Sequence, residues 1–212
     1  MRLKHIPGCE EEVAESPLVL HDPKEVQSYI KSPLFIEIGM GKGRFIIENA
    51  IRNPGICFLG IEMYESVMIK AIRRLNEMGD ERPDNVRFIR CDAADIKDYL
   101  PEKSVDRIYL NFSDPWPKNR HAKRRLVSGG FLLLFRDLLS RDANIEFKTD
   151  NTDLFDFGLE EYEGAGYKLL YETRDLHADM AAMKDNIMTE YEQKFSEQGN
   201  KICKFIISPV SQ

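Results

Sequence analysis

The run Leu34-Phe35-Ile36-Glu37-Ile38-Gly39-Met40-Gly41-Lys42-Gly43 holds a short apolar stretch that stops at alternating glycines. An apolar run of this length, closed by glycine, is typical of a buried strand. Residues 44–52 follow with the spacing of a helix. A strand, a glycine turn and a helix in this order open many nucleotide-binding α/β sheets. The run therefore predicts an α/β fold with a ligand near the glycines.

The same alternation continues along the chain and predicts the rest of the sheet. Strand-like and helix-like segments alternate, which favours a mostly parallel sheet with helices on both faces. The expected strands are 34–38, 57–62, 86–91, 105–112, 143–149, 167–173 and 202–208, and the expected helices are 44–52, 66–78, 132–139 and 151–164. We expect one domain over residues 1–212, with an irregular, mobile N-terminal segment at about residues 1–30.

Length and composition fit a globular protein with one well-buried core. The 212 residues are 42% hydrophobic, and their net charge of −6 argues against a protein that is basic throughout. No apolar run reaches the roughly 20 residues of a membrane span, and the N-terminus lacks a signal peptide, so we expect a cytoplasmic protein. The four cysteines are far apart, which predicts reduced thiols and no metal site. Monomer and homodimer both stay open.

Acidic residues stand at the ends of three successive expected strands, and the first of them precedes the glycines. The acids are Glu37, Glu62 and Asp92, and the glycines are Gly39, Gly41 and Gly43. A carboxylate here would repel the pyrophosphate of a dinucleotide but attract the sulfonium and α-ammonium groups of S-adenosylmethionine. The second acid stands where such sheets bind ribose hydroxyls, and the third can accept from the adenine amine. Because strand ends converge at one edge, the pattern predicts an S-adenosylmethionine site; glycine turns with helix-capping acids are the alternative.

The segment at 111–126 (NFSDPWPKNRHAKRRL) follows the fourth expected strand and combines an acid with a cluster of cations. Two prolines stiffen the chain around Trp116, which would fix Asp114 against the N1–H and amino group of a guanine. The cations suit phosphate contacts, and Trp116 suits stacking on a base. A solvated helix face and core packing are the respective alternatives. The expected phosphate contacts are Arg120, Lys123, Arg124 and Arg125.

Two other functions fit part of this pattern. One is an enzyme of the same fold that acts on a protein or a small molecule, which the basic segment disfavours because a small acceptor needs no phosphate contacts. The other is a non-enzymatic RNA-binding scaffold, which the intact Glu37, Glu62 and Asp114 disfavour. A thermal shift with S-adenosylhomocysteine distinguishes a working cofactor site from a scaffold.

The chain resembles the bacterial tRNA (guanine-N7-)-methyltransferases over nearly its whole length. The shared motifs are E-I-G-x-G-K-G at 37–43, N-F-S-D-P-W-P-K-x-R-H-x-K-R-R-L at 111–126, F-K-T-D-N at 147–151 and N-I-M-T-E-Y-E at 186–192. The resemblance implies the Rossmann-like class I methyltransferase fold and S-adenosyl-L-methionine as cofactor. It also implies tRNA as substrate, with methylation at N7 of guanine 46 in the variable loop.

The resemblance also implies roles for individual residues. It implies cofactor contacts from Glu37, Glu62, Asp92 and Asp114, with Asp114 as the catalytic residue. The implied substrate contacts are Lys118, Asp150, Thr189, Glu190, Tyr191 and Glu192. Spacing alone does not place residues 189–192 in a site, and an ordinary helix start is their alternative. The stretch Val127-Ser128-Gly129-Gly130 departs from the family pattern, and its two glycines predict a loosened helix start.

Overall fold

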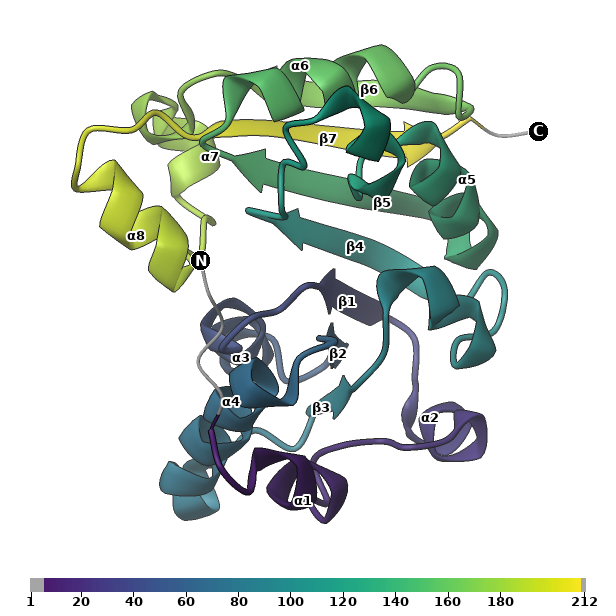
Figure 1. Ribbon diagram of the computed structural model, residues 1–212, viewed down its shortest axis with the longest axis vertical. Helices are drawn as coiled ribbons and strands as arrows, with labels where there is room; N and C mark the ends of the chain where they lie inside the picture. Colours follow the sequence, from purple (N-terminus) through teal and green to yellow (C-terminus); the bar gives the residue numbers. More distant parts are fainter. Residues whose placement is uncertain (1–5, 211–212) are drawn as a thin grey trace. The chain divides into compact units, whose positions relative to one another are not determined.

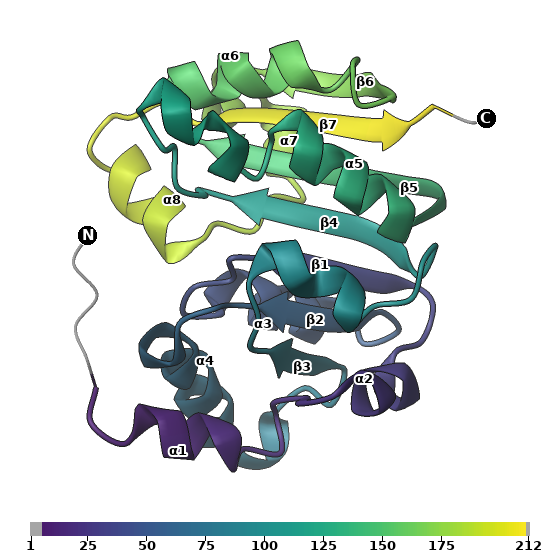
Figure 2. The same cartoon turned by 45° about the vertical axis from the view of Figure 1, so that its right-hand side comes forward.

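In the computed structural model, which describes residues 6–210, the run at 34–43 forms the predicted strand and turn. Strand β1 (Leu34–Ile38) leads into the glycines, and helix α3 (Arg44–Arg52) follows them. The chain forms two compact units that divide after residue 101. Figure 1 shows the helices and strands of each unit, and Figure 2 shows the same cartoon turned by 45° about the vertical axis. The two units are described separately below.

The first unit contains three parallel strands in the order β3-β2-β1. Strand β2 (Cys57–Ile61) pairs with β1, with Leu59 opposite Ile36, and β3 (Val86–Ile89) pairs with β2. Helix α3 packs on β2 and β3, and helix α4 (Glu65–Glu77) buries its apolar face in the same core. The same unit contains two 3₁₀ helices, η1 (Gly79–Glu81) and η2 (Ala93–Asp98).

The N-terminal segment is helical where the sequence predicted irregular structure. Helix α1 (Cys9–Ala14) packs against α4, and its side chains Cys9 and Val13 are buried in the core of the first unit. Helix α2 (Pro23–Tyr29) begins with proline at its first position, where the ring favours a helix. The prediction for residues 1–30 is therefore wrong at 9–14 and 23–29, because such short helices lack a long periodic pattern. Residues 1–5 lie outside the described part of the chain.

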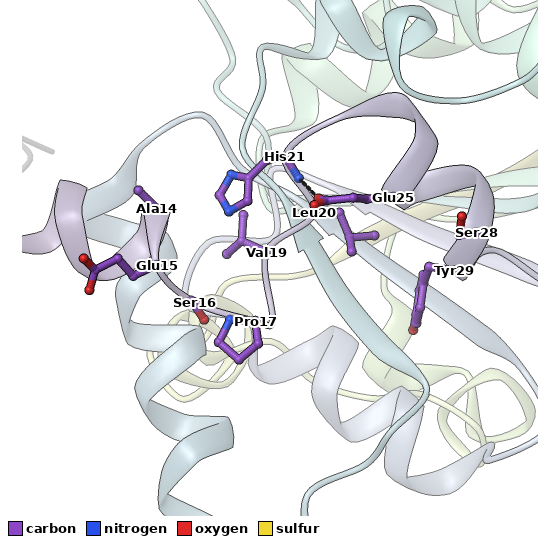
Figure 3. Close-up of a pocket in the computed structure, with 10 residues that line it drawn as sticks. All are labelled: Ala14, Glu15, Ser16, Pro17, Val19, Leu20, His21, Glu25, Ser28 and Tyr29. Atoms are coloured by element: carbon purple, nitrogen blue, oxygen red, sulfur yellow. Dashed lines mark hydrogen bonds between the residues drawn. The ribbon is translucent and has the colours of Figure 1, made fainter.

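Local hydrogen bonds fix the connection between these two helices. The carboxylate of Asp22 caps α2 by accepting from the N–H groups of Lys24 and Glu25. Figure 3 shows the hollow lined by this segment, where the backbone N–H of His21 donates to Glu25 Oε2 at 2.6 Å. The segment thus has its own capping structure as well as its buried face.

The second unit contains four strands in the order β4-β5-β7-β6. Their bounds are Val105–Asn111 for β4, Leu139–Thr149 for β5, Tyr167–Thr173 for β6 and Cys203–Pro209 for β7. Strands β4 and β5 are parallel, whereas β7 is antiparallel to both β5 and β6. Across the chain, the strand pairs are therefore mostly parallel, as the sequence predicted, and the structure adds that β7 is antiparallel to its neighbours.

Helices and short turns surround the strands of the second unit. The helices are α5 (Gly129–Leu138), α6 (Thr152–Glu161), α7 (Met180–Met183) and α8 (Glu190–Ser196), and the 3₁₀ helices are η3 (Asn119–Arg124) and η4 (Leu176–Ala178). Helix α6 contacts β5 and β7 and buries Leu154 and Phe155. No helix among residues 6–210 is long and apolar enough to cross a membrane.

All seven expected strands are present, and the differences lie at their ends. Strand β5 begins at Leu139 rather than at residue 143, because Leu139 pairs with Val105 before a shift in the register. Helix α5 begins at Gly129, so the start predicted at residue 132 is late. Both differences follow from neighbours in space, which spacing along the sequence does not reveal.

Candidate active site

The glycines after β1 form a turn with positive φ angles, a backbone conformation that favours glycine. Gly39, Gly41 and Gly43 have φ angles of 74°, 59° and 75°. A Cβ at Gly43 would also lie 2.6 Å from the Cβ of Ala71 on α4, so this position requires glycine for two reasons. A Cβ built at Gly39 or Gly41 meets no described atom within 4 Å. The turn therefore leaves its backbone open to the close approach of a ligand.

Glu62 holds the glycine turn to the end of β2. Its Oε2 accepts from the N–H of Gly41 at 3.1 Å, and its Oε1 accepts from the N–H groups of Met63 at 3.0 Å and Tyr64 at 3.1 Å. The residue is buried. The structure thus brings Glu62 and the glycines together, and it gives the carboxylate a bracing role that the sequence did not reveal.

Glu37 is a buried acid in an otherwise apolar strand. It lies in β1 opposite Gly60 of β2 and is only 2% exposed. Carboxylates are rarely found at this depth unless they are paired or hydrogen-bonded, because burial in an apolar core is costly. Its position two residues before Gly39, the first glycine of the turn, favours a role in ligand binding over a role in packing.

Asp92 lies at the surface, beside a hollow of the first unit. Its carboxylate accepts from the N–H of Ala94 at 2.9 Å and so caps η2. Helix capping is the alternative role that the sequence offered for the acids at the strand ends. The hollow has a volume of about 450 Å³, and Asp92, Met63 and Tyr99 are among its lining residues. A cap and a ligand contact are compatible, since a carboxylate can accept about four hydrogen bonds.

The segment after β4 is strained on both sides of Asp114. Phe112 has a φ of 52° and Trp116 a φ of 42°, a region that non-glycine residues seldom adopt. Such residues cost about 1–3 kcal/mol each and persist where the surrounding structure enforces them, often at functional sites. The N–H of Phe112 donates to the Lys148 carbonyl at 2.8 Å, which fixes one end of the segment. Asp114 itself is exposed.

Trp116 packs against its own segment. The guanidinium carbon of Arg124 lies 4.9 Å from the centroid of its ring, and the His121 ring meets it edge-on at 5.8 Å. The side chain is half-buried. The structure therefore places Trp116 in neither the core nor an open stacking position.

The basic segment forms the 3₁₀ helix η3, and its cations differ in surroundings. Lys118 precedes η3, and Arg120, Lys123 and Arg124 belong to it; all of them are exposed. Arg125 is half-buried, and its guanidinium donates from Nε to the Pro115 carbonyl at 3.0 Å and from Nη2 to the Trp116 carbonyl at 3.2 Å. The sequence grouped Arg125 with the phosphate contacts and did not foresee this internal role.

Asp150 and Tyr191 lie together at the start of α8. Burial raises the pKa of the Tyr191 hydroxyl, and the Asp150 carboxylate adds to the effect. The Tyr191 ring stacks on Phe195 with centroids 4.0 Å apart and lies 4.9 Å from Phe112. Tyr191 is nevertheless 41% exposed. The structure thus joins two predicted substrate residues to an aromatic cluster beside the strained segment.

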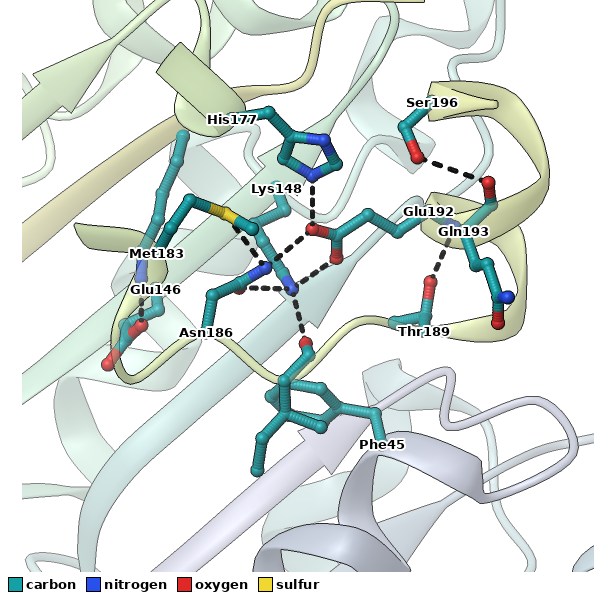
Figure 4. A network of polar contacts seen from close by, with 12 residues as sticks. Phe45, Glu146, Lys148, His177, Met183, Asn186, Thr189, Glu192, Gln193 and Ser196 are labelled. Carbon is teal, nitrogen blue, oxygen red and sulfur yellow. Dashed lines mark hydrogen bonds and ion pairs between the residues drawn. The ribbon is translucent and has the colours of Figure 1, made fainter. Parts of the chain in front are cut away.

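Glu192 lies in the interior of the second unit, in a network shown in Figure 4. Lys148 Nζ donates to Glu192 Oε2 at 2.6 Å, to Asn186 Oδ1 at 3.2 Å and to the Ile187 carbonyl at 3.0 Å. The other oxygen, Oε1, lies 3.0 Å from His177 Nε2 and accepts from Asn186 Nδ2 at 2.7 Å. Lys148 and Glu192 are 3% and 0% exposed, so the pair fastens α8 to β5.

Burial and charge act in opposite directions on this pair. Burial alone would raise the pKa of Glu192, but the charge and hydrogen bond of Lys148 outweigh it and lower that pKa. Burial lowers the pKa of Lys148, and the Glu192 carboxylate opposes that shift. The ionised carboxylate of Glu192 is therefore the form that the folded protein favours.

Sequence reasoning missed the partners of Glu192, which are Lys148, His177 and Asn186. One signal was available, because T-x-x-E at 189–192 is a helix-start pattern and Thr189 Oγ1 does accept from the Glu192 N–H at 2.9 Å. The pattern predicts that the glutamate side chain reaches back to the cap. Here it reaches into the core instead, toward a lysine 44 positions earlier in the chain.

The glycines at 129 and 130 do not loosen the start of α5. The N–H of Gly129 donates to Glu161 Oε2 on α6 at 2.6 Å. A Cβ at Gly129 would lie 3.0 Å from the same oxygen, so glycine permits this contact. The expected loosening is therefore wrong, because a hydrogen bond from another helix holds the first turn.

Comparison with known proteins relates these sites to a family. Residues 31–205 match a family model described as "Putative methyltransferase". A tRNA (guanine-N(7)-)-methyltransferase of Lachnoclostridium phytofermentans is 47% identical over 97% of both chains. The enzyme of that name from Lysinibacillus sphaericus is 42% identical over 96% of both. The chain belongs to the tRNA (guanine-N(7)-)-methyltransferase family.

Solved structures show the same fold at much lower identity. An antibiotic-related methyltransferase has a TM-score of 0.62 and 18% identity, covering 88% of this chain and 92% of its own. The 16S rRNA methyltransferase KamB has a TM-score of 0.63 and 12% identity with the same coverage. These structures confirm the Rossmann-like methyltransferase fold. That the chain is a methyltransferase rests on the relatives described above. Within residues 6–210, no three His, Cys, Asp or Glu side chains gather where they could hold a metal ion.

Proposed function

We propose that this methyltransferase transfers the methyl group of S-adenosyl-L-methionine to N7 of guanine 46 in the variable loop of tRNA, in the cytoplasm. The observation that carries the proposal is the match, over nearly the full length of the chain, with enzymes named for N7 methylation of guanine in tRNA. The donor and the position in tRNA go beyond those names. The donor rests on the acids and glycines of the first unit, and the position in tRNA rests on the resemblance to the family.

The first unit supplies the residues that would hold the donor. The open backbone at Gly39 and Gly41 suits the methionine part, and the buried carboxylate of Glu37 suits its α-ammonium group. Glu62 would bind the ribose hydroxyls with the carboxylate that also braces Gly41. Asp92, in the hollow beside β3, would accept from the adenine amine.

The second unit supplies the residues that would hold the tRNA. Asp114 would accept from the Watson–Crick edge of the guanine, and Asp150 and Tyr191, which lie next to each other, would also contact the substrate. The exposed cations of η3 would contact phosphates around the base. Because the guanine lies in folded tRNA, we expect it to be drawn out of its stack to react. The other proposed substrate residues are Lys118, Thr189 and Glu190; Glu192, which is 0% exposed, would serve the substrate by holding α8 in place.

Methyl transfer to guanine N7 mainly requires that the base and the donor be held in the right positions. When bound, S-adenosylmethionine would supply a methyl group on a sulfonium sulfur, so that transfer leaves S-adenosylhomocysteine and a positively charged purine. Guanine N7 has a lone pair and no proton, so no general base is needed, and Asp114 has two tasks. It orients the base for in-line attack, and its negative charge stabilises the positive charge that develops on the ring.

A thermal melt tests the donor site without any tRNA. With S-adenosylhomocysteine at 100 times its dissociation constant, we expect stabilisation of about 2.7 kcal/mol and a rise in Tm of roughly 5–10 °C. NAD serves as the control. The carboxylate of Glu37 should repel its pyrophosphate, so NAD should not bind and the Tm should stay unchanged. A protein that melts at the same temperature with and without S-adenosylhomocysteine would instead be a scaffold.

A further inference from the structure

We propose that Arg125 is a positioning residue, which holds the strained segment around Asp114 in shape instead of contacting tRNA phosphate. The inference deepens the proposed function, because it concerns the segment that would orient the guanine. It rests on the two carbonyls that accept from the guanidinium, on the strained backbone of Trp116 between them, and on the ring that supports the guanidinium.

The guanidinium bonds two consecutive carbonyls next to Asp114. Nε donates to the Pro115 carbonyl at 3.0 Å and Nη2 to the Trp116 carbonyl at 3.2 Å. These carbonyls lie on either side of the Trp116 Cα, and the φ of 42° at Trp116 is unfavourable for a non-glycine residue. Strain of this kind persists only where neighbouring groups enforce it. Arg125 supplies that enforcement from a position ten residues along the chain.

Packing leaves the guanidinium in one orientation. Its central carbon lies 4.3 Å from the centroid of the Phe157 ring, which belongs to α6. The ring supports one face of the planar group while its edge donates to the carbonyls. Arginine provides this combination of a flat face and a rigid fork of donors, and lysine does not. The neighbouring cations Lys123 and Arg124 are exposed, whereas Arg125 is half-buried.

The two roles of Arg125 predict different results. A phosphate contact is a matter of charge, so Arg125→Lys would largely preserve it and removal of the charge would weaken the dependence of tRNA affinity on salt. A brace is a matter of geometry, so Arg125→Lys would lose it and the salt dependence would stay as in the wild type. Lys123→Ala is the matched control, because Lys123 is an exposed cation of the same segment.

Trp116 makes the brace measurable, because it is the only tryptophan of the chain. In Arg125→Lys and Arg125→Ala, we expect acrylamide to quench its fluorescence more strongly than in the wild type. We also expect single-turnover methyl transfer to fall on the order of 10²-fold in Arg125→Ala, since small misplacements of reacting groups have effects of this size. The salt slope of tRNA binding should stay unchanged in both variants and become shallower in Lys123→Ala.

The opposite pattern would overturn the inference. If Arg125→Lys quenches like the wild type and Arg125→Ala flattens the salt slope as Lys123→Ala does, Arg125 contacts phosphate. Methylguanidinium added to Arg125→Ala should restore both rate and quenching if the brace is the cause. The quenching measurement needs neither donor nor tRNA, so it decides the matter even if the wild type proves to methylate another acceptor.

Discussion

Replacing Asp114 with alanine is expected to lower the single-turnover rate of methyl transfer by about 10²–10³-fold, the range seen when one group that stabilises transition-state charge is removed. In the proposed mechanism its carboxylate both orients the guanine and stabilises the positive charge that develops on the purine. Affinity for S-adenosylhomocysteine should fall much less, because the first unit supplies most of the donor contacts. The measurement is a rapid-quench assay with saturating donor and tRNA.

Two variants make this result specific. Asp114→Asn keeps the size of the side chain and loses its charge, so it should lose most of the rate if charge matters. Asp142→Ala removes an exposed acid in β5 of the same unit and should react at the wild-type rate. A near-normal single-turnover rate in Asp114→Ala would remove this residue from the chemistry.

Replacing Glu192 with alanine is expected to destabilise the fold by about 3–5 kcal/mol, the usual effect of leaving one partner of a buried ion pair alone. Lys148, which is 3% exposed in the structure, would lose the carboxylate that pairs with its ammonium group. For a chain of this size the Tm should fall by roughly 6–20 °C. Denaturant and thermal unfolding followed by circular dichroism measure both quantities.

The double variant Lys148→Met/Glu192→Met tests the cause. It removes both charges, so it should recover much of the stability that Glu192→Ala loses. The surface ion pair of Arg73 with Glu12 is the control; its side chains are 47% and 41% exposed, and Arg73→Ala should change the Tm little. Equal losses in the single and double variants would mean that packing, and not charge, accounts for the effect.

Acid should remove the same contribution from the wild type. The pKa of Glu192 is lower in the folded protein than in the unfolded chain, where a glutamate titrates near 4.3. Its contribution to stability is therefore complete above that value and is lost as the pH falls through the lowered pKa.

The strands and the glycine turn could be predicted because their signals are local. The segments 34–38 and 167–173 match β1 and β6 at both ends. The first is the apolar run of a buried strand, whereas the second mixes apolar and polar residues, as expected of a strand at the edge of a sheet. The glycines after β1 predict a tight turn. The ends of parallel strands converge at one edge of the sheet, which brings Glu62 to Gly41. The strands and the turn follow from patterns within a few residues, and the approach of Glu62 to Gly41 follows from the general geometry of parallel sheets.

The rest depends on contacts between distant residues. No spacing rule pairs Lys148 with Glu192 or places Arg125 on the carbonyls of Pro115 and Trp116. The short helices α1 and α2 were missed because they are too short for a clear periodic pattern: α1 is held by the burial of Cys9 and Val13, and α2 is capped by Asp22. The glycines at the start of α5 were misjudged because their stabilising partner, Glu161, lies on another helix.

Methyl transfer from labelled S-adenosylmethionine to unmodified tRNA transcripts tests the central claim most directly. The account predicts that label enters a transcript with guanine at position 46 and not a matched transcript with adenine there. Borohydride and aniline should then cleave the labelled RNA at that position, which identifies N7-methylguanosine. Label that enters both transcripts equally, or no label on any tRNA from a protein that binds S-adenosylhomocysteine, would contradict the proposed reaction.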